Sequence, residues 1–190
     1  MFNNNNSGGS GGGVYHSTGS LSVINTLFDK NDSTGAGGAI CSNGTVYLRN
    51  CTLTGNHAKS VNQGGGIYLG SASATLYAYN SVIWGNTVDS GTAYNINTYS
   101  NCLIQPLKRC YFNGGIMDYS GSPDVSDCIN SANNPFQNNS DQNSSLYLRP
   151  NSELVDKGNN SYLDIALYST DLAGNPRKVG TIDIGCYEKQ

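Results

Sequence analysis

Apolar and polar residues alternate in three short stretches of the chain, at residues 21–25, 46–50 and 76–80. They read Leu-Ser-Val-Ile-Asn, Val-Tyr-Leu-Arg-Asn and Leu-Tyr-Ala-Tyr-Asn, with apolar residues four and two positions before each asparagine. A period of two is typical of a β-strand that buries one face, and no window of the chain shows the wider spacing of a helical stripe. Glycine, serine and asparagine, which favour turns, separate the stretches. The pattern therefore predicts an all-β protein.

A glycine motif precedes each alternating stretch at a nearly constant interval. It reads Gly-Gly-Gly-Val-Tyr at 11–15, Gly-Gly-Ala-Ile-Cys at 37–41 and Gly-Gly-Gly-Ile-Tyr at 64–68, so successive copies start 26 and 27 residues apart. A second motif, with an asparagine at each end, follows at 25–31, 50–56 and 80–86. A repeat of about 26 residues with short strands and no helix is typical of one turn of a parallel β-helix. We expect a right-handed parallel β-helix of about four turns with an irregular C-terminal cap.

Stacked repeats place equivalent side chains above one another in columns. Three apolar columns are expected to face inward: Val14, Ile40 and Ile67; Leu21, Val46 and Leu76; and Val23, Leu48 and Ala78. The next inward column comprises Asn25, Asn50, Asn80 and Asn101, whose amides we expect to bond one another in a ladder. Two further columns hold small residues (Thr26, Cys51, Ser81 and Cys102) and large residues (Phe28, Leu53, Ile83 and Ile104). The glycine pairs suit tight corners that need a positive φ.

The chain is expected to form one domain, with β-helix turns at 1–104 and loop-rich C-terminal turns and a cap at 105–190. The regular register ends after Ile104. Phe2 and the asparagines after it match residues 28–31 without a preceding strand, so we expect the natural chain to continue upstream. An open first turn would then be available for self-association. A disordered, glycine-rich segment is the alternative, but it does not explain why apolar residues stay in register.

Composition narrows the classes of partner. The chain has a net charge of −3, a pI near 5.1 and 12% charged residues, which argues against nucleic acid or an anionic membrane surface. No apolar run is long enough to span a membrane, so a membrane would be reached only through an anchor outside this chain. Six cysteines are compatible with an oxidising compartment. Cys110 and Cys128 are the most plausible disulfide pair, whereas Cys51 and Cys102 would stand about 9–10 Å apart in one column.

Four motifs mark the C-terminal part: Asn-Pro-Phe at 134–136, Leu-Tyr-Leu-Arg-Pro-Asn-Ser-Glu-Leu-Val-Asp-Lys-Gly at 146–158, Asp-Leu-Ala-Gly-Asn-Pro-Arg at 171–177 and Asp-Ile-Gly-Cys-Tyr-Glu at 183–188. Together they resemble the C-terminal signature of secreted right-handed parallel β-helix proteins of Bacteroidetes and related bacteria, a family often called "choice-of-anchor Q". Val155 and Cys186 depart from the isoleucine and alanine usual in that signature. The resemblance implies a secreted or outer-surface protein.

The polar residues of these motifs suit a terminal cap. Asp171 can cap the turn that follows it through an Asx-type bond. Arg177 is placed to pair with Asp183 or Glu188 where the chain folds over the last turn. Asp156 suits a turn before a glycine. These residues could instead form a site, but the structural role is favoured.

The front repeats resemble a second family. Phe-Asp-Lys-Asn at 28–31 and Gly-Gly-Ala-Ile at 37–40 are similar to the tetrapeptide repeats of chlamydial polymorphic outer membrane proteins. Members of that family are surface-displayed β-helical adhesins, so the resemblance implies the same fold and a surface location.

Catalytic chemistry is poorly represented. Many β-helix proteins cleave acidic polysaccharides by β-elimination, which needs a base and a cation that neutralises the uronate. The candidates are few and dispersed: His16 and His57 in expected exposed turns, the scattered Lys30, Arg49 and Lys59, and the acidic pair Asp29 and Asp32. We therefore assign no catalytic residue, no metal site and no cofactor.

The outward columns point to binding instead. Tyr47 stacks above Tyr77 and Arg49 above Tyr79, while Tyr15, Cys41 and Tyr68 form another outward column. Tyrosine faces along a flat sheet can stack on sugar rings, and tyrosine also simply favours sheet surfaces. We expect a non-catalytic binding face for a polysaccharide, a host glycan or another host surface, made by Tyr47, Tyr77, Tyr79 and Arg49. The alternatives are a fragment of a polysaccharide lyase or glycoside hydrolase with catalytic turns upstream, and a structural spacer.

Overall fold

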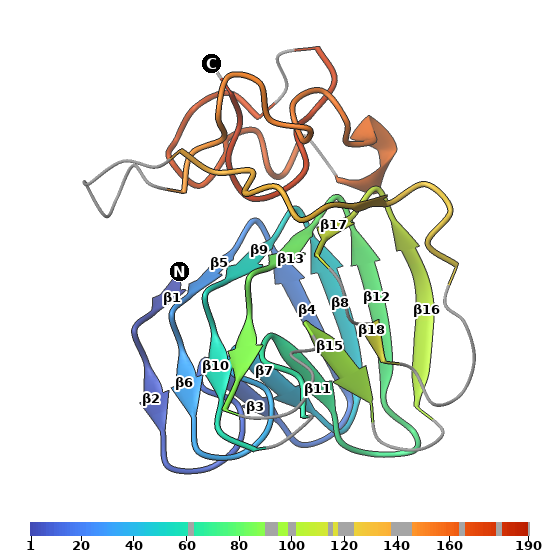
Figure 1. Cartoon of the computed structure of the whole chain (residues 1–190). Helices are drawn as coiled ribbons and strands as arrows, with labels where there is room; N and C mark the ends of the chain where they lie inside the picture. The colour runs from blue at the N-terminus through green and yellow to red at the C-terminus, as the bar shows by residue number, and fades with distance from the viewer. Residues whose placement is uncertain are drawn as a thin grey trace.

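A computed structural model describes residues 1–60, 63–89, 95–98, 102–113, 116–117, 124–137, 146–163, 166–177 and 180–189 of the chain. This part of the chain is a parallel β-solenoid of about 4 turns followed by a largely irregular C-terminal segment (Figure 1). The predicted all-β, parallel β-helical fold is thus confirmed. The described helical structure is a single 3-10 turn, η1 (Asn160–Tyr162).

Four parallel sheets wrap the solenoid, and they are named A to D here. Sheet A contains β1 (Phe2–Asn3), β5 (Leu27–Asp29), β9 (Thr52–Thr54), β13 (Val82–Trp84), β17 (Tyr111–Phe112) and β19 (Ile129–Asn130). Sheet B contains β2 (Asn6–Ser7), β6 (Asp32–Ser33), β10 (His57–Ala58) and β14 (Thr87–Val88). Sheet C contains β3 (Val14–His16), β7 (Ile40–Ser42), β11 (Ile67–Leu69), β15 (Ile96–Thr98) and β18 (Ile116–Met117). Sheet D contains β4 (Ser20–Ile24), β8 (Thr45–Arg49), β12 (Thr75–Tyr79) and β16 (Leu103–Lys108).

The three apolar columns form in the register that the sequence predicts. Val14 pairs with Ile40 and Ile40 with Ile67, and the strands of sheet D pair in the same stepwise way. The central members of these columns are fully buried: Ile40, Ile67, Val46, Leu48, Leu76 and Ala78. The glycine corners adopt positive φ, and at Gly37 (φ +67) an added Cβ would lie 2.3 Å from the Ile40 carbonyl oxygen. Only glycine therefore fits this corner.

The predicted register is wrong at the fourth turn. Ile104 lies in β16 and pairs with Leu76 of sheet D, while Phe112 takes the expected place beside Ile83. The register shifts within β16, where Leu107 rather than Pro106 stands opposite Ala78. This irregularity hides the alternation of two, because one extra residue moves every later side chain to the other face. The solenoid consequently continues past residue 104.

Two expected columns change accordingly. Cys110 rather than Cys102 follows Ser81 in the small column, since Tyr111 N donates to the Ser81 carbonyl as Val82 N does to that of Cys51. Asn101 lies outside the described residues.

The asparagine ladder runs along a different column from the one predicted. Its amide nitrogens donate to the amide oxygens of the next member at 2.7–2.9 Å through the series Asn5, Asn31, Asn56, Asn86, Asn95 and Asn113. Asn31, Asn56 and Asn86 are the asparagines that close the second sequence motif, and each is buried. By contrast, Asn25, Asn50 and Asn80 adopt φ of 47–48°. The bond between Asn50 and Asn80 is 3.4 Å long, and their other partners lie in the C-terminal segment.

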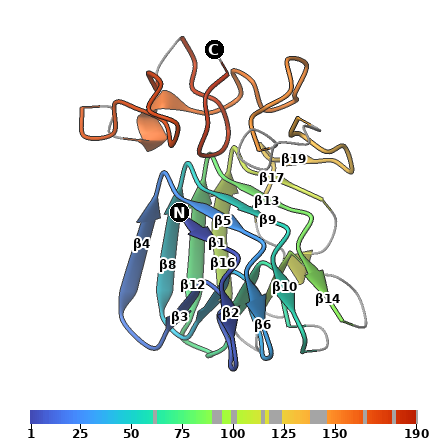
Figure 2. The ribbon, with the colours of Figure 1, turned by 90° about the vertical axis from the view of Figure 1, so that its left-hand side faces the viewer.

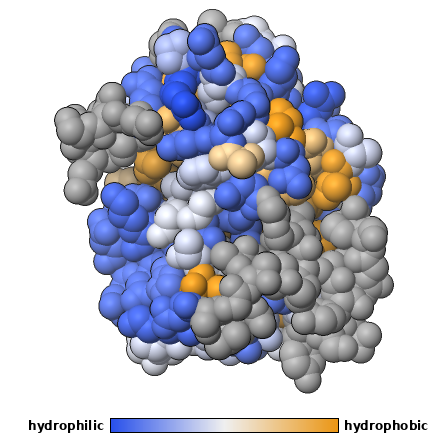
Figure 3. All heavy atoms as spheres, in the orientation of Figure 1, coloured by the Kyte–Doolittle hydropathy of each residue, from blue (hydrophilic) through white to orange (hydrophobic). Residues whose placement is uncertain are grey.

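The C-terminal segment covers the side of the solenoid rather than the end of its last turn (Figures 1 and 2). It lies over the outer face of sheet A, whose outward column Leu27, Thr52, Val82 and Tyr111 is buried. The Thr170 carbonyl accepts from Asn25, the Asp183 carbonyl from Asn50 and the Asn159 carbonyl from Asn80. The segment thus bonds to three successive turns. On the side shown in Figure 3, hydrophilic residues cover most of the coloured surface.

The predicted contacts of Asp171 and Arg177 form, but the segment that they stabilise covers the side of the solenoid and is not a cap on its last turn. The Asp171 carboxylate accepts from the backbone of Ala173 at 2.9 Å and of Asn175 at 2.8 Å, as an Asx-type cap does. Arg177 pairs with Glu188 at 2.9 Å, and its side chain is fully buried. Its second terminal nitrogen donates to Asn25 Oδ1 at 2.7 Å, which fastens the segment to the first turn.

A buried group of charges makes stability depend on pH. Arg177 is buried with Asp171, Asp183 and Glu188, so carboxylates outnumber the guanidinium. Burial raises the pKa of Glu188 from 4.5 to about 7, against the attraction of Arg177 and with repulsion from Asp183. Between these two pKa values the folded protein holds a proton that the unfolded chain releases. The free energy of unfolding therefore falls as pH rises through this window.

We expect the free energy of unfolding to fall by about 1–3 kcal/mol as the pH rises from 4.5 to 8 and Glu188 loses its proton. The measurement is urea unfolding across this range for the wild type and for Glu188→Gln, which removes the titration and keeps the shape. The difference between the two proteins isolates Glu188. A wild type that gains stability relative to the variant as pH rises would contradict the prediction.

Candidate binding face

The outer face of sheet D carries the residues that the sequence predicts for binding. Strands β8 and β12 pair so that Tyr47 stands beside Tyr77 and Arg49 beside Tyr79. Val46, Leu48, Leu76 and Ala78 alternate with them and are fully buried. Since successive side chains of a strand point to opposite faces, the three tyrosines and Arg49 project outward, where each is half-buried. The structure therefore brings all four predicted residues onto one face.

The two stacked tyrosines do not lie flat on the sheet. The ring centroids of Tyr47 and Tyr77 are 4.8 Å apart and the ring planes differ by 11°. Parallel rings this close must overlap face to face in an offset stack, so each ring covers one face of the other. The ring edges, the hydroxyls and the outer ring faces are left for a ligand. This differs from the expected row of open ring faces.

The Arg49 guanidinium lies close to the rings of two of the tyrosines. Its guanidinium carbon lies 5.8 Å from the ring centroid of Tyr47 and 5.6 Å from that of Tyr79, within cation–π range. Among the described residues, no carboxylate forms an ion pair with it. Arg49 therefore keeps its positive charge and its donors available at the centre of the face.

A fourth tyrosine, which the sequence did not identify, extends the face. Tyr162 of η1 packs against Tyr79 with ring centroids 5.0 Å apart and planes inclined by 50°. Asn159 caps η1 by accepting from Ser161 N. Its backbone N–H donates to Asn80 Oδ1, and its carbonyl accepts from Asn80 Nδ2. These bonds join residues 79 positions apart, so no local pattern could have revealed them.

A hollow of about 210 Å³ lies between sheet D and η1. It is lined by Arg49, Tyr79, Ser161 and Tyr162. The lining combines two aromatic rings, a guanidinium and a hydroxyl, which are groups that suit the apolar face and the hydroxyl rim of a sugar. The hollow, rather than the stacked pair, is the concave part of the face.

Sheet D ends in a charged edge beside this hollow. Lys108 of β16 pairs with Tyr79 in register and donates to Asp124 at 2.6 Å. This hydrogen bond raises the pKa of Lys108. It is also the main reason why the pKa of Asp124 is lowered to about 2. Both side chains of the pair are therefore ionised at neutral pH.

The two histidines lie away from the sheet D face. The prediction that they occupy exposed turns is wrong, because both lie in strands. His16 is in β3 and its Nδ1 lies 2.8 Å from Ser42 Oγ. His57 is in β10 and lies between Thr87 Oγ1 and Asp89 Oδ1, both at 2.9 Å. Sheets B and C carry them, so neither joins the sheet D face.

The acidic pair and the third outward column also lie away from this face. Asp29 is buried, and burial raises its pKa, whereas Asp32 pairs with Lys59 at 3.3 Å. In the part of the chain that the structure describes, no group of three histidine, cysteine or acidic side chains is placed to hold a metal ion. Tyr15, Cys41 and Tyr68 of sheet C pair in the predicted register, but Cys41 is only 4% exposed.

The six cysteines all lie in the described part of the chain, and none of them forms a disulfide there. Cys110 and Cys128 occupy successive turns, and Cys110 N donates to Cys128 Sγ at 3.4 Å, but they form no disulfide. Burial raises the pKa of the Cys51 thiol to about 11, and Cys102 lies in a different column. These thiols are packing residues, which donate to backbone carbonyls of the turns.

Comparison with known protein families finds one match, and it covers a short stretch of the chain. Residues 25–43 match the Chlamydia polymorphic membrane protein (Chlamydia_PMP) repeat. The matched stretch runs from the corner after β4 through β7, so it spans most of one solenoid turn. No curated protein and no solved structure shows significant similarity to the chain. Across the described residues, no helix has the length and apolar character needed to cross a membrane. The repeat and the solenoid together indicate a surface or adhesin-like repeat protein.

Proposed function

We propose that the protein is a surface-displayed β-solenoid that binds carbohydrate, either a polysaccharide or a host glycan, without catalysis. The observation that carries the proposal is the hollow between Arg49, Tyr79, Ser161 and Tyr162, beside the stacked Tyr47 and Tyr77. Aromatic rings and hydrogen-bonding groups converge there on a face that parallel strands hold rigid.

The geometry supports one arrangement of the ligand. A sugar ring in the hollow would place its apolar face against Tyr79 or Tyr162, which are inclined to each other by 50°. Arg49 and Ser161 would donate to its hydroxyls. The next sugar would pass along the edges of Tyr47 and Tyr77, whose hydroxyls bond to sugar rims. A linear glycan would thus run along the direction of β8 and β12, across the solenoid axis.

The proposed location is the outer surface of a cell or the secreted fraction. The repeat match supports a surface protein. The C-terminal motifs at 134–136, 146–158, 171–177 and 183–188 support a choice-of-anchor Q type of segment from a Bacteroidetes-like bacterium. In this proposal the C-terminal segment stabilises the side of the solenoid through its bonds to three successive turns.

The proposal is tested by a glycan-array screen, run with a lyase assay on uronate polysaccharides. We expect binding without formation of an unsaturated product. Tyr79→Ala should weaken binding at least about tenfold, because it removes one wall of the hollow, and Tyr77→Ala should weaken it less. Tyr15→Ala is the matched control, since Tyr15 is a 56% exposed tyrosine on sheet C.

The other results are informative as well. Product formation would show a polysaccharide lyase and overturn the non-catalytic proposal. Silence in both assays would favour a structural spacer. Equal losses in Tyr79→Ala and Tyr15→Ala would remove the sheet D face as the binding surface.

A further inference from the structure

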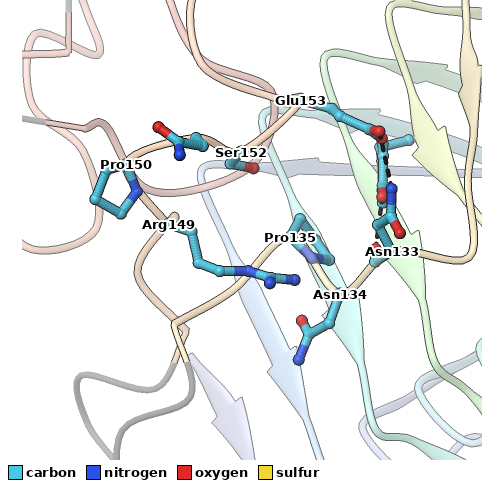
Figure 4. A pocket seen from close by; sticks show the side chains of 9 residues that line it. Asn133, Asn134, Pro135, Arg149, Pro150, Ser152 and Glu153 are labelled. Carbon is cyan, nitrogen blue, oxygen red and sulfur yellow. Dashed lines mark hydrogen bonds between the residues drawn. The ribbon is translucent and has the colours of Figure 1, made fainter.

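A second cavity lies outside the sheet D face, beside β17 of sheet A (Figure 4). It has a volume of about 340 Å³ and lies between residues 133–135 and 149–153. This volume falls within the usual range of small-molecule sites. The Tyr111 side chain lines it, and the Tyr111 hydroxyl donates to the Asn133 carbonyl at 2.6 Å.

Backbone bonds hold the two walls of the cavity together. Phe136 and Leu148 form an isolated antiparallel bridge, and Arg149 N donates to the Pro135 carbonyl at 3.1 Å. Beyond this point a turn closes through the bond from Ser152 N to the Arg149 carbonyl at 3.0 Å. The cavity is therefore a built feature of the C-terminal segment and not a gap between loosely placed loops.

Arg149 provides the cation of the cavity. Its side chain extends from the turn toward Pro135 and Asn134 (Figure 4). It is half-buried, and within the described ranges its guanidinium has neither a hydrogen-bond partner nor an ion-pair partner. A guanidinium carries five donors in a planar fork that matches a carboxylate. A partly desolvated fork without a partner points to an anionic ligand.

Glu153 limits what this anion can be. It lies at the opposite side of the cavity and accepts from Asn133 Nδ2 at 3.1 Å (Figure 4). The Glu153 carboxylate repels an anion held at Arg149, and it repels a dianion such as sulfate more strongly than a monoanion. A monoanion with hydroxyl groups can instead donate to Glu153 while it binds Arg149.

We infer that this cavity binds a sugar residue that carries a carboxylate. The carboxylate pairs with the Arg149 fork, and ring hydroxyls bond to Glu153 and to the Ser152 hydroxyl. Pro135 and Pro150 line the cavity with apolar surface, which suits the C–H groups of a sugar ring. The inference stands apart from the sheet D proposal, because the two surfaces share no residue.

The test is an NMR titration of the isotope-labelled protein with glucuronate and, separately, with glucose. We expect glucuronate to shift the backbone amides of residues 149–153 and to bind at least about tenfold more tightly than glucose. Arg149→Gln should lose this preference. Lys157→Gln is the control, because it removes an exposed cation from the same segment and should retain the preference.

Each contrary result is distinct. Absence of shifts at 149–153 with glucuronate, or equal binding by Arg149→Gln, would overturn the inference. Shifts at Tyr79 and Tyr162 alone would overturn it while supporting the sheet D proposal. A second variant tests the inference in case Arg149→Gln does not fold. Glu153→Gln should bind inorganic sulfate more tightly than the wild type does, and unchanged sulfate binding would contradict the role given to Glu153.

Discussion

Replacing Arg177 with methionine is expected to lower the free energy of unfolding by about 3–5 kcal/mol, because it removes one partner of a buried ion pair. The Arg177 side chain is fully buried and the Glu188 side chain is 3% exposed. Besides Glu188, its terminal nitrogens bind Asn25 Oδ1 and the Gly185 carbonyl. The variant therefore leaves Asn25 Oδ1 and the Gly185 carbonyl without this donor, and it leaves the Glu188 carboxylate with the backbone N–H of Asp183 but without its cation. Urea unfolding at pH 8, where Glu188 is ionised, measures the loss.

The double variant Arg177→Met/Glu188→Leu is the control for this prediction. Replacing both charges with apolar side chains removes the unpaired carboxylate, and such replacements are often nearly neutral. We expect the double variant to regain most of the lost stability. A loss below about 1 kcal/mol in Arg177→Met would contradict the view that this residue fastens the C-terminal segment to the solenoid.

The second large effect is expected at the centre of the asparagine ladder. Asn56→Ala should lower the free energy of unfolding by about 3 kcal/mol or more, since several buried groups lose their partners at once. Asn56 Oδ1 accepts from both the backbone and the amide of Asn31, at 3.0 and 2.8 Å. Its Nδ2 donates to Asn86 Oδ1 at 2.8 Å and to the Phe28 carbonyl at 3.0 Å. Thermal and urea unfolding both report the change.

Asn50→Ala is the matched comparison, because Asn50 is equally buried but has longer hydrogen bonds. Its amide atoms reach Asn80 at 3.4 Å and the Asp183 carbonyl at 3.5 Å. We expect a smaller loss, part of which arises from the positive φ of 48° that alanine tolerates poorly. If Asn50→Ala were the more damaging variant, the ladder through Asn56 would not be the asparagine column that contributes more to stability.

These comparisons indicate where local patterns mislead. Both asparagines of the second motif recur with the same period, so the sequence offers no reason to prefer one as the ladder. The backbone decides: Asn50 adopts a left-handed conformation next to the C-terminal segment, whereas Asn56 does not. The predicted register of the fourth turn is wrong for a related reason. The register shift within β16 breaks the alternation on which the prediction depended.

The sequence by itself determined the fold class, the inward apolar columns, the glycine corners and the outward placement of Tyr47, Tyr77, Tyr79 and Arg49. These follow from a period of two within each strand and a repeat of about 26 residues, both of which are local properties. Only the tertiary structure decided what covers the solenoid and where the hollows lie. Arg177 meets Asn25 across 152 residues and Asn159 meets Asn80 across 79. Such contacts depend on the path of an irregular segment with no repeating pattern, so they leave no periodic signal in the chain.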